Sequence, residues 1–286
     1  MTTDNKWPRA AELLTHDLSP IGLIDIPAHE TSISKTNAWQ TPAAIRESLN
    51  RYSSHSMDSG QLQFIQDLGA IQDPDKNEAH AIEELRAVQN KLLIALGGDN
   101  SITYAVAMAR LKNLQNSGVI TLDAHHDLRE GVSNGSPIRR LIDSGVDPKN
   151  IVQIGINSFS NSTYYSNLAK DYGITVISRD EIASTGIELA CEKALKQLSH
   201  CSEIHVDLDV DVCDRSAVPA CPASAPGGIS AYELRIAARK LIQNPKVVSC
   251  DITEIDASQD SADGRTVRLG ALLVLEAVAG FGLRGD

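Results

Sequence analysis

The chain has 286 residues, of which 42% are hydrophobic and 22% are charged, and its formal net charge at pH 7 is −11. This length and composition allow a sizeable core, and we expect one α/β domain over residues 1–286. The acidic balance, without any basic tract, argues against nucleic acid or an anionic membrane surface as a partner.

Apolar, β-branched runs alternate with helical patterns along most of the chain. Strands are predicted over residues 21–26, 91–96, 118–123, 151–156, 174–178, 203–211 and 247–255. Helices are predicted over residues 41–52, 78–90, 101–114, 136–144, 160–171, 186–199, 230–242 and 266–281. This alternation is typical of a parallel sheet that helices cover on both faces. Ligands of such sheets bind beyond the carboxyl ends of the strands.

Neither a signal sequence nor a membrane span is predicted. The N-terminal segment lacks the charged and then apolar pattern of a signal, and no apolar run approaches the roughly 20 residues that cross a bilayer. We therefore expect a cytoplasmic protein without a membrane partner. The five cysteines are scattered and form no CxxC pair, so we expect them to be reduced and mostly packed.

Three polar segments end or directly follow predicted strands. Residues 97–101 read GGDNS, residues 123–127 read DAHHD, and residues 207–211 read DLDVD. Side chains on a strand alternate faces, so Asp123, His125 and Asp127 would point one way if the extended chain persists. Asp209 and Asp211 would do the same.

So many converging carboxylates cannot all stay ionised without a cation, because buried like charges raise each other's pKa values. The donors are oxygen-rich and include one imidazole but no thiolate, which favours Mn²⁺ or a similar octahedral ion over structural zinc. The excess of carboxylates indicates two ions that share a bridging aspartate and acidify a water molecule. Hydrolysis is therefore the leading reaction class.

With these segments the chain resembles the Mn²⁺-dependent ureohydrolases, the family of arginase, agmatinase and formimidoylglutamase, over nearly its whole length. Residues 97–101 are similar to the GGDHS motif of that family, residues 123–127 to DAHxD, residues 209–228 to DxD…P…G, and residues 251–254 to the DIxE strand. The resemblance implies a three-layer, arginase-like α/β fold around an eight-stranded parallel sheet. It also implies a homo-oligomer, either a trimer or a hexamer.

The resemblance further implies two Mn²⁺ ions per subunit. The implied ligands are Asp123 and Asp209, which would bridge the ions, Asp127 and Asn100, which would complete one coordination sphere, and His125 and Asp211, which would complete the other. Glu254 would face the amidine-type cation of the substrate, since a carboxylate can accept paired N–H bonds from a planar cation.

Two positions depart from the family pattern. Asn100 replaces the first histidine ligand, and Asn134 stands where arginase and agmatinase carry a histidine that handles protons. An amide oxygen is a weaker ligand than imidazole, so we expect the first metal site to be weak or rich in water. Proton delivery to the leaving amine would then rest on Asp127 or on bulk water. Asp127 and Glu254 are thus the candidate catalytic residues.

The details favour one branch of the family. Formimidoylglutamases tolerate substitution at these positions, and residues 125–129 and 133–137 look more like theirs than like arginase. The implied reaction converts N-formimidoyl-L-glutamate and water to L-glutamate and formamide, a step of histidine degradation. The candidate substrate-binding residues are Asn134, Ser136, Arg129, Arg139 and Glu254. Arg129, Arg139 and Arg140 lie near enough in sequence to clamp the substrate's two carboxylates.

Two alternatives stay open. A guanidino-compound hydrolase that releases urea would use the same metal centre on a related small molecule. The two asparagines are also compatible with a catalytically silent relative that binds a ligand. Of the remaining polar residues, we expect His126 to face away from the ligands, and His205 and Asp207 to be structural residues deeper in the sheet.

Overall fold

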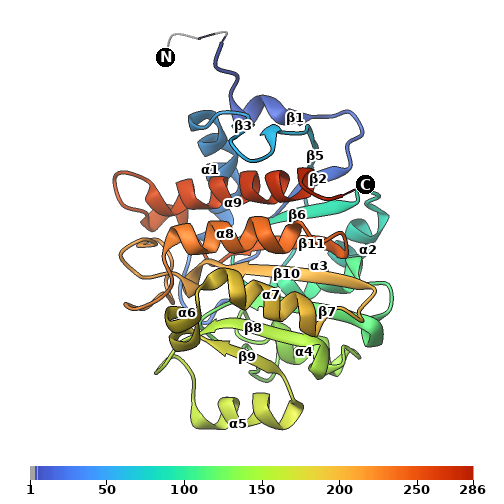
Figure 1. The fold of residues 1–286 in the computed structure, drawn as a ribbon, viewed down its shortest axis with the longest axis vertical. Helices are drawn as coiled ribbons and strands as arrows, with labels where there is room; N and C mark the ends of the chain where they lie inside the picture. The colour runs from blue at the N-terminus through green and yellow to red at the C-terminus, as the bar shows by residue number, and fades with distance from the viewer. Residues whose placement is uncertain (1–3, 5, 286) are drawn as a thin grey trace.

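The computed structural model describes residue 4 and residues 6–285, and a parallel sheet forms its centre (Figure 1). Its nine strands lie in the order β1-β5-β2-β6-β11-β10-β7-β8-β9, and every neighbouring pair is parallel. The strands are β1 (Leu14–Thr15), β2 (Ile21–Ile26), β5 (Ile65–Ala70), β6 (Leu92–Gly97), β7 (Ser117–Leu122), β8 (Ile151–Ile156), β9 (Thr175–Ser178), β10 (Glu203–Asp209) and β11 (Val247–Thr253). A separate antiparallel pair is formed by β3 (His55–Ser56) and β4 (Gly60–Gln61).

The predicted parallel sheet is confirmed, but it has nine strands where eight were expected. The additional edge strand is β1, whose two residues pair with the start of β5. The pattern of apolar residues did not predict β5, because most of its residues are only partly buried or exposed. The seven strands that were predicted are all present within a few residues of their expected bounds.

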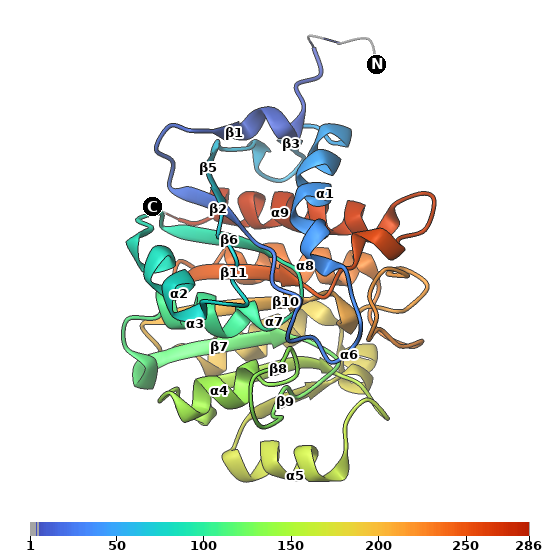
Figure 2. The same ribbon diagram turned by 180° about the vertical axis from the view of Figure 1, so that it is seen from behind.

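Helices cover both faces of this sheet, as the alternation predicted. Figure 1 shows α7, α8 and α9 in front of the strands, and Figure 2 shows α2, α3 and α4 on the opposite face. The helices are α1 (Thr41–Ser48), α2 (Glu78–Ala87), α3 (Ile102–Arg110), α4 (Pro137–Asp143), α5 (Thr163–Tyr172), α6 (Arg179–Thr185), α7 (Ile187–Gln197), α8 (Ala231–Ile242) and α9 (Arg265–Gly282). Together these elements form the three layers that the resemblance implied.

Local signals explain where several helices begin and end. Ser230 accepts a hydrogen bond from the Glu233 N–H, and the Glu233 side chain accepts one from the Ser230 N–H, so a capping box begins α8. Helix α3 ends at Arg110, four residues earlier than predicted, because Leu111 is already extended. Helix α6 was not predicted; Gly186, with φ 87°, separates it from α7.

The topology places four strand ends side by side. Strands β6, β11, β10 and β7 are consecutive in the sheet, and in a parallel sheet their carboxyl ends lie at one edge. The polar segments at residues 97–101, 123–127, 209–211 and 253–254 follow or end these strands, so the fold brings them together. Within the described part of the chain, no helix is both long enough and apolar enough to span a membrane.

Candidate metal centre

The turn after β6 is held tightly against the end of β11. Gly98 accepts a hydrogen bond from the Glu254 N–H through its carbonyl oxygen, at 2.9 Å. A Cβ atom at position 98 would lie 2.0 Å from the carbonyl oxygen of Ala28, so only glycine fits there. In the same turn, the Asn100 N–H donates to Oε1 of Glu254, also at 2.9 Å.

Asp123, His125 and Asp211 form the tightest cluster of potential metal ligands. One ligand atom from each lies within 4.8 Å of the other two. The Nδ1 atom of His125 is 2.7 Å from Oδ2 of Asp211 and 3.5 Å from Oδ1 of Asp123. Oδ2 of Asp123 is buried and has no hydrogen-bond partner among the residues that the structure describes. An unpaired buried carboxylate oxygen within an acidic cluster is suited to bind a cation.

The sequence suggested that an extended chain would bring these side chains together. In the structure the chain is not extended over these residues. Strand β7 ends at Leu122, and Asp127 has a positive φ of 52°. Beyond β10, residues Val210–Val212 form a 3-10 turn in which the side chain of Asp209 accepts a hydrogen bond from the Asp211 N–H at 2.8 Å. Two tight turns therefore aim these carboxylates, in place of strand alternation.

Asn100 is held by both ends of its carboxamide. Its Nδ2 donates to Oδ2 of Asp127 at 2.7 Å. Its Oδ1 accepts from Thr103 Oγ1 at 2.6 Å and from Thr253 Oγ1 at 3.2 Å. The oxygen that the sequence assigned to the first metal is thus engaged by two hydroxyl groups, while the amino group faces the acidic cluster.

A cavity of about 240 Å³ opens above these residues. Seven of the site residues predicted from the sequence line this cavity: His125, Asp127, Arg129, Asn134, Asp209, Asp211 and Glu254. Asn134 connects two walls, because its Nδ2 donates to Oε1 of Glu254 at 2.9 Å and its Oδ1 accepts from the Ile33 N–H at 3.0 Å. Asp123 and Asn100 are buried next to these lining residues.

The structure does not support two of the expected substrate-binding residues. Ser136 is fully buried, and its hydroxyl bonds to the backbone of Ser133, so it closes a turn and does not line the cavity. Arg139 lies on α4, where its guanidinium pairs with Asp143 four residues later at 3.1 Å. Arg140 likewise pairs with Glu78 on α2. Of the three arginines, only Arg129 reaches the cavity.

Burial dominates the electrostatics of the centre. Burial and the neighbouring carboxylates raise the pKa values of Asp123 and Asp209 well above their usual range. Burial also raises the pKa of Asp127 to about 7 and that of Glu254 to about 8. Burial alone would lower the pKa of His125, but Asp211 beside it raises that pKa to about 10. Crowded carboxylates that hold protons in this way fit a site whose ionised form requires cations.

Sequence reasoning missed part of the cavity wall. Asn161 accepts a hydrogen bond from the His126 N–H at 2.9 Å and lines the cavity beyond the end of β8. The polar run after the predicted strand at residues 151–156 was the available signal. The contact between the Ile33 backbone and Asn134 was also missed, because the segment before α1 lies far from the motifs in sequence.

All three residues that were expected to be structural are buried, but His126, which was expected to face away from the ligands, also lines the cavity. His126 is buried and bonds to Oε1 of Gln153 through Nδ1 at 2.7 Å. His205 and Asp207 are fully buried on β10. Nε2 of His205 lies 3.2 Å from Oδ2 of Asp251 on the adjacent strand.

Comparison with known proteins agrees with this geometry. The sequence is 33% identical over 284 residues to a formimidoylglutamase of Bacillus subtilis strain 168, covering 93% of this chain and 89% of that protein. The crystal structure of formimidoylglutamase from Bacillus subtilis superimposes with a TM-score of 0.92 at 31% identity and covers 100% of this chain and 95% of that one. Trypanosoma cruzi formiminoglutamase, solved with Mn²⁺, shares the fold with a TM-score of 0.86 at 21% identity, over 98% and 100% of the two chains.

A family-wide comparison gives the same result. The sequence model described as "Arginase family" matches residues 19–280, which include every strand from β2 to β11 and every residue of the cluster. The chain therefore belongs to the arginase family.

Proposed function

We propose that this protein is a formimidoylglutamase, which hydrolyses N-formimidoyl-L-glutamate to L-glutamate and formamide. The observation that carries the proposal is that Arg129 lines the same cavity as Glu254 and the acidic cluster. Among the residues that the structure describes, Arg129 has no carboxylate within ion-pair distance. The substrate carries two carboxylates besides its amidine carbon. Its amidine group can therefore bind at Glu254 and the acidic cluster, while a carboxylate pairs with the guanidinium of Arg129.

We propose Mn²⁺ as the cofactor, with two ions per subunit. Asp123 and Asp209 would bridge the ions, Asp127 and position 100 would complete the first sphere, and His125 and Asp211 would complete the second. When bound, such ions supply Lewis-acid chemistry and lower the pKa of a coordinated water toward neutrality. The engagement of Oδ1 of Asn100 by two threonine hydroxyls supports a first site that is weak or completed by water.

Glu254 is suited to recognise the amidine group. Hydrogen bonds from the Asn100 N–H and from Nδ2 of Asn134 converge on its Oε1 and fix the carboxyl group. Its second oxygen, Oε2, accepts no hydrogen bond from the described residues. The carboxylate can therefore accept an N–H of the planar amidinium cation and hold the carbon to be attacked above the acidic cluster.

The proton for the leaving nitrogen has two candidate carriers. Asn134 cannot donate a proton to the product, because an amide does not titrate near neutral pH. One is Asp127, which lines the cavity and accepts a hydrogen bond from Asn100. Because its carboxyl group titrates, Asp127 can take the proton that the nucleophilic water loses and pass it to the leaving nitrogen. Bulk water that enters the cavity is the other carrier.

We also propose that the protein is a single domain over residues 1–286 and a cytoplasmic homo-oligomer, either a trimer or a hexamer. The resemblance to the ureohydrolases supports the assembly. Light scattering coupled to size-exclusion chromatography measures the mass directly. A monomeric mass would contradict this part of the proposal.

A product assay tests the reaction. Mn²⁺-loaded protein is incubated separately with N-formimidoyl-L-glutamate, arginine, agmatine and a guanidino acid. We expect formamide from the first compound and no urea from the others. Urea as the main product would favour a guanidino-compound hydrolase. A protein that retains less than one equivalent of Mn²⁺ and turns over none of the compounds would be a silent binding relative.

A further inference from the structure

A large cavity lies at the amino-terminal ends of the strands, opposite the metal centre. Its volume is about 1160 Å³, and many of its lining residues lie where strands begin and helices end. Pro20, Lys91 and Glu203 stand at or just before the starts of β2, β6 and β10, while Arg110 and Gly282 end α3 and α9. We call this cavity the basic pocket.

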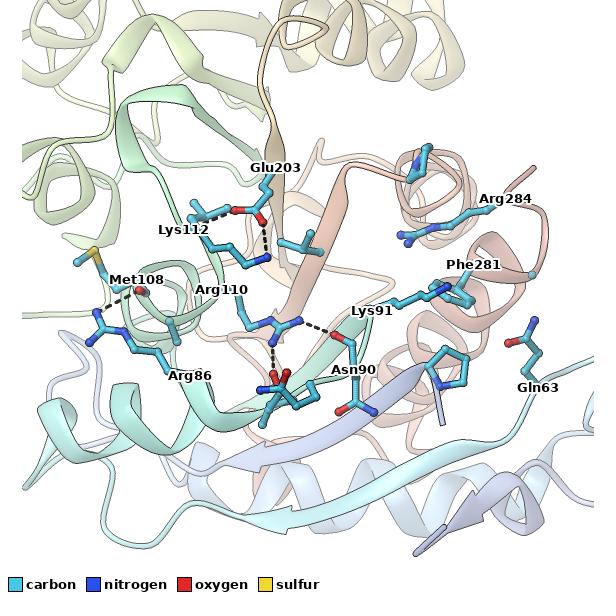
Figure 3. Close-up of a pocket in the computed structure, with 18 of the residues that line it drawn as sticks. Gln63, Arg86, Asn90, Lys91, Met108, Arg110, Lys112, Glu203, Phe281 and Arg284 are labelled. Carbon is cyan, nitrogen blue, oxygen red and sulfur yellow. Dashed lines mark hydrogen bonds and ion pairs between the residues drawn. The ribbon is translucent and has the colours of Figure 1, made fainter. Parts of the chain in front are cut away.

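The charge of the basic pocket is opposite to that of the whole chain. Among the described residues, its basic lining residues are Arg86, Lys91, Arg110, Lys112 and Arg284, and Glu203 is its one acid. Five positive charges and one negative charge leave an excess of four in a chain with a formal net charge of −11. Figure 3 shows Arg110 between the pair formed by Lys112 and Glu203 and the group formed by Lys91, Phe281 and Arg284.

The guanidinium groups are fixed by neutral acceptors. Arg110 donates to the carbonyl oxygens of Val88 and Asn90, both at 2.6 Å. Arg284 donates to the carbonyl oxygens of Ile242 at 2.9 Å and Val247 at 2.8 Å. Their positions are therefore set before any ligand arrives, which lowers the entropic cost of binding one.

The carboxyl ends of nearby helices reduce the positive charge of the basic pocket but do not cancel it. The helices α2, α3, α8 and α9 end around the basic pocket, and each C-terminus carries roughly half a negative charge. Four ends supply about two negative charges in total. About half of the positive excess therefore remains.

The pKa values of the two partly buried arginines show the same imbalance. Burial lowers the pKa of Arg110, and Glu203 raises it only in part. Burial lowers the pKa of Arg284 to about 10. The Lys112 ammonium lies 3.3 Å from Oε1 of Glu203, whereas no described carboxylate lies within ion-pair distance of Lys91. A bound anion would restore the balance.

We propose that the basic pocket binds a small divalent anion of the sulfate, phosphate or dicarboxylate class. Lys91 and Lys112 are exposed and can turn toward the ligand, while Arg110 and Arg284 supply a fixed positive field. This site is separate from the catalytic cavity, so the proposal does not depend on the reaction that the protein catalyses.

The test measures anion binding to the full-length, Mn²⁺-loaded protein. Sodium sulfate and sodium succinate are titrated by calorimetry, and sodium chloride at the same ionic strength serves as the reference. We expect saturable binding of sulfate or succinate, and Lys91→Gln weakens it by at least about fivefold, as expected for the loss of one nearby charge. The matched control is Lys170→Gln on α5, another exposed lysine, which leaves the affinity unchanged. Turnover stays the same in both variants.

Three results would overturn the proposal. One is the lack of saturable binding beyond the chloride reference. The second is equal binding to the Lys91→Gln variant. The third is self-association that Lys91→Gln abolishes while neither anion binds, because the basic pocket would then be an interface between copies.

Discussion

The amide nitrogen Nδ2 of Asn100 donates a hydrogen bond to Oδ2 of Asp127 at 2.7 Å, so the residue at the proposed first metal position acts as a donor to a neighbouring proposed ligand. A histidine at position 100 would offer a ring nitrogen lone pair to the cation in place of an N–H group. We expect Asn100→His to tighten the first site, by about tenfold or more. Calorimetric titration of the metal-free protein with Mn²⁺ measures this. An unchanged affinity would mean that position 100 is not a ligand.

Asp123 and Asp209 are expected to support both ions at once. Replacing either carboxylate with asparagine removes a bridging charge, so each of Asp123→Asn and Asp209→Asn should lose both equivalents of Mn²⁺ and the activity with them. The metal-free variants should stay folded, because burial already favours the uncharged forms of both side chains. Elemental analysis with circular dichroism distinguishes the outcomes. Retention of one full equivalent would show that the two sites are independent.

Glu254 should contribute to substrate binding and turnover but not to metal binding. Glu254→Gln keeps the shape of the side chain and removes the charge that faces the amidinium group. We expect kcat/KM to fall about 10- to 100-fold, the loss of one charge-assisted hydrogen bond. The Mn²⁺ content should not change. A variant with normal kcat/KM would place the amidine elsewhere in the cavity.

Arg129 and Arg139 form a matched pair for testing carboxylate recognition. Both substitutions to glutamine remove one positive charge, yet only Arg129 lines the cavity, while Arg139 pairs with Asp143 on α4. We expect Arg129→Gln to raise KM for N-formimidoyl-L-glutamate by about tenfold or more and Arg139→Gln to leave it unchanged. Initial-rate kinetics provide the comparison. Equal effects of the two variants would argue against a specific clamp by Arg129.

The metal-free protein should lose stability as the pH rises. Burial raises the pKa of Asp127 to about 7 and that of Glu254 to about 8, whereas unfolded carboxyl groups ionise near pH 4. Between about pH 4 and pH 8 the folded chain therefore holds more protons than the unfolded chain, and the free energy of unfolding falls with increasing pH. Thermal melts of chelator-treated protein measure this. Mn²⁺ should remove the fall, and a metal-free Tm that rises across this range would contradict the account.

The sequence was sufficient to predict which residues come close together when their position follows directly from the sheet. Asp123 and Asp209 come at the ends of apolar strands, and a parallel sheet brings such ends to one edge, so their proximity could be inferred. The turn at Asp127 could not, because a positive φ in a residue other than glycine leaves no mark in the pattern of apolar residues.

Spacing alone could not separate the arginines. Arg129 and Arg139 follow the same motif, but Pro137 at the start of α4 places Arg139 one helical turn before Asp143, where the two side chains pair. The contact of the Ile33 N–H with Asn134 joins segments about a hundred residues apart through a backbone group. Contacts of this kind depend on how loops pack, which the periodicity of one sequence does not encode.

The central claim is that the acidic edge of the sheet holds a pair of Mn²⁺ ions. Anomalous diffraction from crystals grown with Mn²⁺ tests it most directly. The account predicts two anomalous peaks, with carboxylate oxygens of Asp123 and Asp209 touching both and with His125 touching the second. A map without peaks among these side chains, while Mn²⁺ is present in the crystal, would contradict it.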